Sequence, residues 1–123
     1  MPFRSPHYVL EPFGRGHRLT RTDRAFEELS ELAAAHDALL PELARARSGP
    51  LLVDLRDAKG RNDPSFERAM AGYRRAMFEG FPTVVVLVRT AIGKLQVQRH
   101  FVEDGLDGAV ITTSEEEAEA ALR

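Results

Sequence analysis

Thr83–Val88, with the sequence TVVVLV, is the stretch that decides the fold, and Arg89–Lys94 (RTAIGK) follows it directly. Six β-favouring and almost wholly apolar residues in a row leave no polar face, which is typical of a strand covered by helices on both faces of a sheet. The preceding Phe81–Pro82 favours an extended entry into the strand, and Thr90 is suited to cap a helix. We therefore predict a buried central strand that delivers Arg89 and Thr90 to the start of a helix.

The segments around this strand alternate between strand and helix patterns. Leu51–Leu55 is a second buried strand, and Ala109–Thr112 is a short third one. Two short extended segments, 7–12 and 16–22, are separated by glycines that suit a hairpin turn. Apolar residues at helical spacing predict four helices, which cover about residues 23–45, 63–79, 91–102 and 114–122.

This order of elements predicts the fold class. Strands that alternate with helices are typical of a parallel sheet with right-handed crossovers, and the first hairpin adds an antiparallel edge. We predict an α/β fold in a single domain of residues 1–123, with its core at about 8–122 and a mixed, mostly parallel sheet. A chain of 123 residues can bury about two-thirds of its unfolded surface without disulfides.

Several single residues carry expectations of their own. Asp23 is a good N-cap for the first helix, and Pro41 is expected to kink that helix or to begin a second short one. His36 lies near the apolar stripe of the same helix, so we expect it to be packed in the core. His7 and His17 are expected to be exposed strand residues, because no spacing links them to a set of metal ligands.

Composition excludes several classes of protein. The chain has no cysteine, which excludes disulfides and thiolate chemistry and favours the cytoplasm. A net charge of −2 does not indicate binding to nucleic acid or to an acidic membrane surface. The N-terminus lacks the apolar core of a signal peptide, and no apolar run approaches the ~18 residues of a membrane span. We expect a cytoplasmic protein.

Three stretches together resemble a known family. They are Leu51–Arg56 followed by a polar loop to Asp63–Ser65, the strand Thr83–Val88, and the ending Gly108–Ala118. This combination resembles a STAS-like domain, of the branch similar to sporulation anti-sigma-factor antagonists and often grouped with Sec14-type lipid-binding domains. The resemblance covers most of residues 8–122 and rests on hydrophobic patterns. It implies a bacterial regulatory or interaction module with a sandwich of sheet and helices. We expect no cofactor.

The resemblance also implies one candidate phosphorylation site. Antagonist members of the family carry a phosphorylatable serine at the start of the helix after the central strand. The matching region here is 61–66, in which Ser65 is the only residue with a hydroxyl group. A helix N-terminus tolerates a phosphate, although the charges of Asp63 and Glu67 would repel it.

Charged residues gather where the predicted parallel strands end, which is where open α/β sheets bind ligands. We call this set the rim: Arg56, Asp57, Lys59, Arg61, Asn62, Asp63, Arg89, Thr90 and Lys94. Its cations and the helix start at Thr90 suit an anion such as a phosphate or a carboxylate. The alternative is that the rim pairs its own charges, for example as Arg89–Asp54 or Arg61–Asp57.

The sequence offers no convergent catalytic chemistry. It contains no nucleophile elbow, no zinc-binding set and no carboxylate pair with a defined partner, so we predict that the chain is not an enzyme. His100, with Arg99 and Asp104 near it, is interpreted as a histidine on a helix surface.

Three functional hypotheses follow. The first is a non-catalytic STAS-like module that offers the rim to a protein partner. The second is a carrier of a small anionic or lipid-like ligand, bound at the rim or under the third helix. That helix motivates the second hypothesis because its apolar pattern is irregular: Ile92, Leu95, Val97, Phe101 and Val102. The third is a homodimer, in which Phe3, Tyr8 and Phe13 lie near a sheet edge that pairs with a second copy.

Overall fold

A mixed sheet forms the centre of the computed structural model, which describes residues 2–60, 63–106 and 108–123. Within these residues the sheet has six strands, each beside its neighbour in the chain, so the spatial order is β1-β2-β3-β4-β5-β6. Strands β1 to β3 are antiparallel, and β3 to β6 are parallel. The strands are β1 (Phe3–Arg4), β2 (Tyr8–Phe13), β3 (Gly16–Arg21), β4 (Leu51–Asp54), β5 (Val84–Leu87) and β6 (Val110–Thr112). The predicted α/β class, hairpin and mostly parallel sheet are confirmed, and β1 is an addition.

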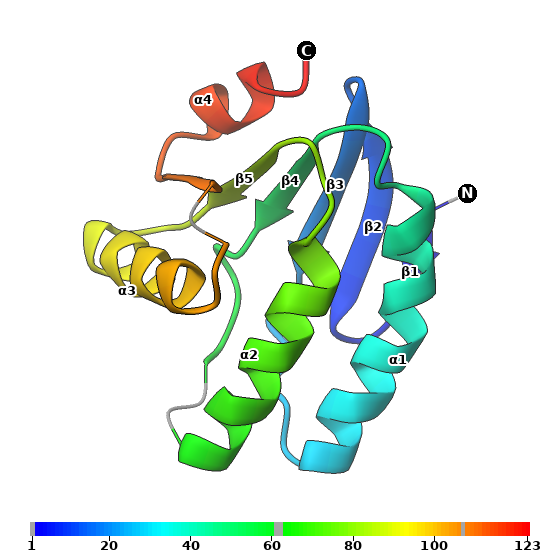
Figure 1. Cartoon of the computed structure of the whole chain (residues 1–123), viewed down its shortest axis with the longest axis vertical. Coiled ribbons are helices and arrows are strands. Elements are labelled where there is room, and N and C mark those ends of the chain that lie inside the picture. The colour runs from blue at the N-terminus through cyan, green and yellow to red at the C-terminus, as the bar shows by residue number, and fades with distance from the viewer. Residues whose placement is uncertain (1, 61–62, 107) are drawn as a thin grey trace.

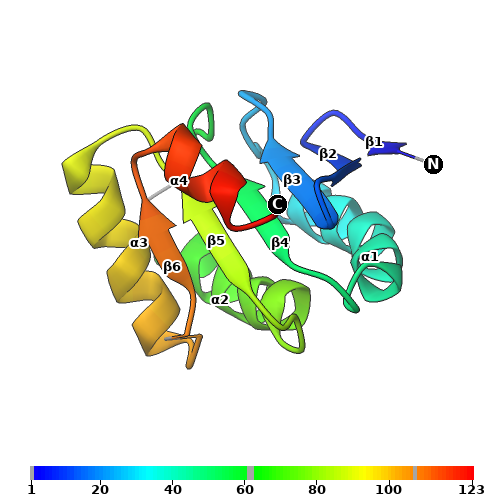
Figure 2. The ribbon, with the colours of Figure 1, turned by 90° about the horizontal axis from the view of Figure 1, so that it is seen from above.

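The helices cover the two faces of the sheet unequally (Figures 1 and 2). Helices α1, α2 and α3 connect successive parallel strands and contribute to one large core, whereas α4 packs on the opposite face. Their bounds are α1 (Leu29–Arg45), α2 (Pro64–Phe78), α3 (Ala91–Glu103) and α4 (Glu115–Ala120). No helix in the described part of the chain is long and apolar enough to cross a membrane.

The central strands β4 and β5 are buried along their whole length. Side chains alternate between the faces, so Val84 and Val86 belong to the large core, whereas Val85 and Leu87 belong to a smaller one on the α4 side. Leu122 completes the smaller core and is fully buried. The strand that decides the fold is therefore covered on both faces, as its sequence predicts.

The first helix differs from its prediction. It begins at Leu29 after the N-cap Glu28, six residues beyond Asp23, and it continues through Pro41 to Arg45 as one helix. The segment before it is held by other bonds, because the Thr22 hydroxyl donates to the carbonyl oxygen of Pro6 at 2.6 Å and accepts from the amide of Arg24. These bonds replace the expected cap and leave residues 22–28 as a loop.

His7 is also different from its prediction, because it is 4% exposed. Its ring stacks on Phe26 with the centroids 4.2 Å apart, and Phe26 in turn lies 5.6 Å from the ring of His36. His36 is fully buried, as expected. Tyr8 is buried too, so it does not lie at the exposed edge that the homodimer hypothesis assigned to it.

The turn between β2 and β3 holds the C-terminal segment in place. The amide of Arg15 donates to the carbonyl oxygen of Leu122 at 2.7 Å, and the Arg15 guanidinium reaches the carbonyl oxygens of Ala121 and Arg123. Gly14 has a φ of +56°, and a Cβ there would lie 2.2 Å from the Leu122 oxygen. Only glycine fits both requirements, so the glycine-containing turn has a packing role as well as a conformational one.

Candidate functional site

The structure brings the loop after β4 and the start of α3 together at the carboxyl ends of the strands. The Arg89 guanidinium donates to the carbonyl oxygen of Arg56 at 3.0 Å and to the Asp57 carboxylate at 2.6 Å. Both side chains of this ion pair are more than half exposed. The predicted rim is therefore one continuous surface at this point.

Arg56 turns away from solvent toward the α4 face of the sheet. It donates to the Asp54 carboxylate through Nε and Nη2, at 3.1 and 2.9 Å, and forms an ion pair with Glu115 of α4. Arg18 of β3 approaches the same Asp54 carboxylate at 2.6 Å. Burial would raise the pKa of Asp54, but the hydrogen bonds from Arg56 and Arg18 outweigh it and lower the pKa to about 2. These contacts join β3, the end of β4 and α4 on the α4 side of the sheet, beside the smaller core.

Arg56, Asp57 and Arg89 of the rim are paired, as the alternative predicts, but the predicted Arg89–Asp54 pair does not form. Arg89 binds Asp57, and Asp54 binds Arg56. The predicted partner Arg61 and its neighbour Asn62 lie outside the described residues.

The other rim residues have separate roles. The Thr90 hydroxyl caps α3 by accepting from the amide of Gly93 at 3.0 Å. Asp63 stands at the N-cap of α2 and makes no side-chain cap bond. Lys94 is half-buried on the first turn of α3, and Ser65 is exposed on the first turn of α2. The structure does not bear on phosphorylation of Ser65, which stays a prediction.

Helix α3 exposes apolar side chains, although the sequence did not predict which of its apolar residues face solvent and which face the core. Ile92, Leu95 and Val102 are 71%, 68% and 63% exposed, whereas Phe101 is buried in the large core. Val110 of strand β6 is exposed too, but it pairs with Val85 and so lies on the α4 side of the sheet, away from this surface. Large apolar side chains that gather on one surface often mark an interaction site. We call Ile92, Leu95 and Val102 the α3 outer face.

A cleft opens on the inner side of α3, between that helix and α2. Its volume is about 260 Å³. The loop after β4 passes between the two helices here (Figure 1). Aromatic and aliphatic side chains form much of the wall, and they are Tyr8, Phe26, Leu32, Phe66, Met70 and Val97. Ala58 and Gly60 of the loop after β4 and several polar side chains complete the wall, and the polar residues are Arg21, Lys59, Glu67, Arg74, Gln96 and His100. The sequence predicted a pocket under this helix as one alternative, but it named only Lys59 and Val97 of this lining.

Two of the charged groups of the cleft belong to a closed network. Arg74 donates to Asp104 and to Glu67, both at 2.5 Å. His100 Nδ1 lies 3.2 Å from the same Glu67 carboxylate. His100 therefore faces the cleft from α3 and is not the isolated surface histidine that the sequence suggested. Arg74 has its charge balanced within the protein.

Arg21 is the deeply buried cation of the cleft, and the acids that act on its charge, Asp23 and Glu31, do so at a distance. It is 5% exposed, and the structure gives it no ion pair with any described residue. Nη1 donates to the carbonyl oxygens of His7 and Thr22, and the guanidinium carbon lies 4.5 Å from the Phe26 ring centroid. Burial lowers the pKa of Arg21. Sequence reasoning missed this residue, although the alternation of side chains along β3 places it on the same face as the core residue Leu19.

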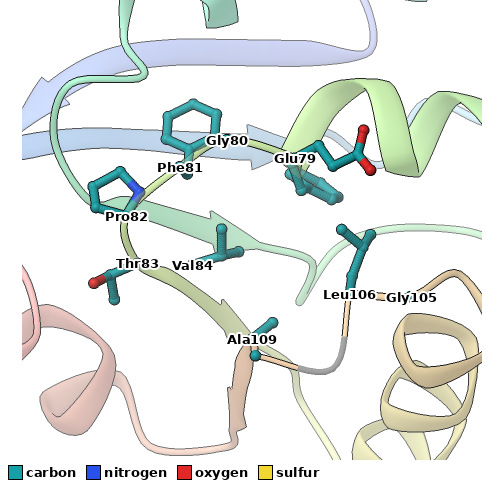
Figure 3. Close-up of a pocket in the computed structure, with 11 residues that line it drawn as sticks. Glu79, Gly80, Phe81, Pro82, Thr83, Val84, Gly105, Leu106 and Ala109 are labelled. Carbon is teal, nitrogen blue, oxygen red and sulfur yellow. The ribbon is translucent and has the colours of Figure 1, made fainter.

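A second cavity of about 240 Å³ lies at the opposite ends of the strands (Figure 3). Val84, Leu106 and Ala109 project into it, and its wall includes the segment Glu79–Thr83. Among the described residues of this lining, Glu79 is the one with a titratable side chain. The described part of this lining offers no set of groups that could recognise a charged ligand, so the cleft is the better candidate site.

Comparison of the chain with protein-family models, with curated proteins and with solved structures found no match in any of the three searches. Within the described residues, no group of three or more His, Asp or Glu side chains is arranged to hold a metal ion. The candidate sites therefore rest on geometry alone.

Proposed function

We propose that this chain is a non-catalytic, STAS-like regulatory module of the bacterial cytoplasm that works by binding a protein partner. The partner surface would be the start of α3 together with the loop after β4, with Arg89, Asp57 and Lys94 at its border. The fold order and the hydrophobic pattern of the strands support the family resemblance. The observation that carries the proposal is the α3 outer face.

Exposed apolar area favours this function over one that depends on charge alone. Ile92 and Leu95 are each about two-thirds exposed or more, and they lie on the two turns that follow Arg89. Burial of side chains of this size on binding contributes roughly 1.5–3 kcal/mol each. The Arg89–Asp57 pair is exposed, and pairs of this kind contribute about 0–1 kcal/mol to stability. Its two charges are thus available to a partner at little cost to the fold.

The first prediction tests this surface with the double variant Ile92→Asp, Leu95→Asp. Tagged protein is used to capture partners from extracts of the source organism, and the captured proteins are identified by mass spectrometry. We expect the wild type to capture a specific partner in stoichiometric amount and the variant to lose it, because two carboxylates would enter an apolar interface. The variant should keep its melting temperature, since both side chains are exposed in the free protein.

The matched control is Leu29→Asp, which changes an exposed leucine on α1. It should capture the partner as the wild type does. Size-exclusion chromatography at two concentrations adds a second readout, because a wild-type dimer that the double variant abolishes would identify a second copy as the partner. Equal capture by all three proteins, with no change in apparent mass, would show that the α3 outer face does not bind the partner, and it would contradict the proposal.

A further inference from the structure

We infer that the cleft between α2 and α3 is a binding site for a small organic carboxylate, with Arg21 as the group that recognises the anion. The cleft shares residues 58–60 of the loop after β4 with the proposed partner surface, but it is lined by the inner side of α3, whereas the α3 outer face, which carries the partner proposal, points to solvent.

The charge of Arg21 is the first argument. Removing a cation from water is costly, and buried charges in proteins are therefore normally paired with an acid or a ligand. Arg21 is 5% exposed, yet its hydrogen bonds within the described chain go to two carbonyl oxygens through Nη1, and Asp23 and Glu31 act on its charge without forming an ion pair with it. A guanidinium has five N–H donors, so Nε and Nη2 retain donors for a further acceptor.

The balance of the neighbouring charges sets the charge of the ligand. Arg74 is neutralised by Glu67 and Asp104, which leaves Arg21 and the exposed Lys59 as the cations of the cleft without an ion pair among the described residues. One buried guanidinium with a lysine at the exposed border suits a single negative charge. A carboxylate matches the planar guanidinium through two parallel hydrogen bonds.

The apolar wall sets the body of the ligand. Phe66, Met70 and Val97 come from α2 and α3 and face the same space as Arg21 and Tyr8. Its volume of about 260 Å³ lies just below the range of roughly 300–1,000 Å³ that is typical of ligand pockets. The cleft therefore suits an aromatic acid or a short aliphatic acid.

The second prediction is tested by titrating the ¹⁵N-labelled protein with sodium benzoate and sodium hexanoate at constant ionic strength. Benzamide serves as the uncharged analogue of benzoate, and inorganic phosphate as an anion without an apolar body. We expect at least one acid to produce saturable shifts in the amide signals of Met70, Gln96 and Val97. Benzamide should bind at least about tenfold more weakly, because it lacks the charge that strengthens a hydrogen bond to arginine.

Variants locate the site. Arg21→Gln should weaken binding of the acid at least about tenfold, and Lys59→Gln about two- to fivefold, because Lys59 is exposed and its attraction is screened by water. Arg75→Gln removes an exposed cation of α2 that does not line the cleft, and it should bind as the wild type does. Lys59→Gln keeps the test valid if Arg21→Gln fails to fold.

Three outcomes would overturn the inference. They are no saturable shifts with either acid in large excess, equal binding of benzamide and benzoate, and binding of phosphate with neither organic acid. Unchanged affinity for the acid in both Arg21→Gln and Lys59→Gln would also overturn the inference. The double variant Ile92→Asp, Leu95→Asp should still bind the acid, so failure of the partner proposal and failure of this one can be told apart.

Discussion

Tyr8 and His36 share a buried hydrogen bond that also fixes the proton positions of both. His36 Nδ1 lies 2.8 Å from the carbonyl oxygen of Leu32, which can only accept, so Nδ1 carries the proton. Nε2 must then accept from the Tyr8 hydroxyl, also at 2.8 Å. Burial raises the pKa of Tyr8 to about 12 and lowers the pKa of His36, so both side chains are neutral.

The third prediction is that Tyr8→Phe lowers the free energy of unfolding by about 1–3 kcal/mol. The substitution leaves His36 Nε2 buried without a donor, which costs the desolvation of that nitrogen. Chemical denaturation measures the change.

Tyr73→Phe is the matched control for this variant. The Tyr73 ring stacks on His36 with the centroids 4.5 Å apart, and no hydrogen bond of its hydroxyl occurs among the described residues. It should therefore cost less than Tyr8→Phe. Equal losses in the two variants would show that ring packing alone stabilises the cluster.

Among the elements, α4 is a short helix that helps to cover a whole face of the central strands. It spans Glu115–Ala120, and with Leu122 just beyond its end it covers the apolar side chains of β4 and β5 on the second face. A helix this short is not stable alone, so it depends on these contacts and on the cap from Ser114.

The fourth prediction is that Leu122→Ala lowers the free energy of unfolding by about 2–5 kcal/mol, because it removes a fully buried side chain and leaves a cavity. Leu95→Ala is the same change at a position that is 68% exposed, and it should cost far less. Denaturation of both variants at one pH gives the comparison. A smaller loss for Leu122→Ala than for Leu95→Ala would mean that Leu122 does not stabilise the second face of the sheet.

The elements also show what the sequence could predict. The strands β4 and β5 were predicted because an unbroken apolar run has few other structures available. The start of α1 was not predicted correctly. The cap signal of Asp23 is local, whereas the bonds of Thr22 to Pro6 and Arg24 form in the folded chain. The exposure of Ile92 and Leu95 was missed for a similar reason, since helical spacing of apolar residues does not show which side meets the core.

The candidate cleft was still less accessible from the sequence. Its polar residues come from β3, the loop after β4, α2 and α3, and they include Arg21, Lys59, Glu67, Arg74 and His100. No short motif links positions that lie so far apart in the chain. What the sequence did provide was the end of the sheet at which to look, because the carboxyl ends of parallel strands meet there.

For the whole molecule, the buried histidines set how stability changes with pH. The pKa of His36 is lowered by burial, and the pKa of His7 is lowered by burial and by the nearby Arg21 charge. In the unfolded chain both return toward their ordinary value of about 6.5. The unfolded state therefore binds more protons below that pH, and acidification favours unfolding.

The fifth prediction is that the free energy of unfolding falls as the pH is lowered from 7 to 5, by up to about 1.4 kcal/mol per pH unit for each histidine. The variant His36→Gln, which retains an acceptor for Tyr8, should show a shallower dependence. Denaturation curves at several pH values measure both slopes. Equal slopes in the wild type and the variant would contradict the role of His36. A further loss is expected below about pH 4, where Asp54 takes up its proton in the unfolded state first.

The bond between the β2–β3 turn and the C-terminal segment has a consequence for how the chain folds during synthesis. The turn at Gly14–Arg15 emerges from the ribosome early, but its partner, the Leu122 carbonyl, emerges more than a hundred residues later. Until then β4 and β5 have their α1 and α2 side covered and their other side bare, with Leu52, Val85 and Leu87 open to water. From the synthesis of β5 to that of Leu122, a nascent chain of this protein thus carries an uncovered apolar sheet face, and a chaperone that shields apolar strands would find it there.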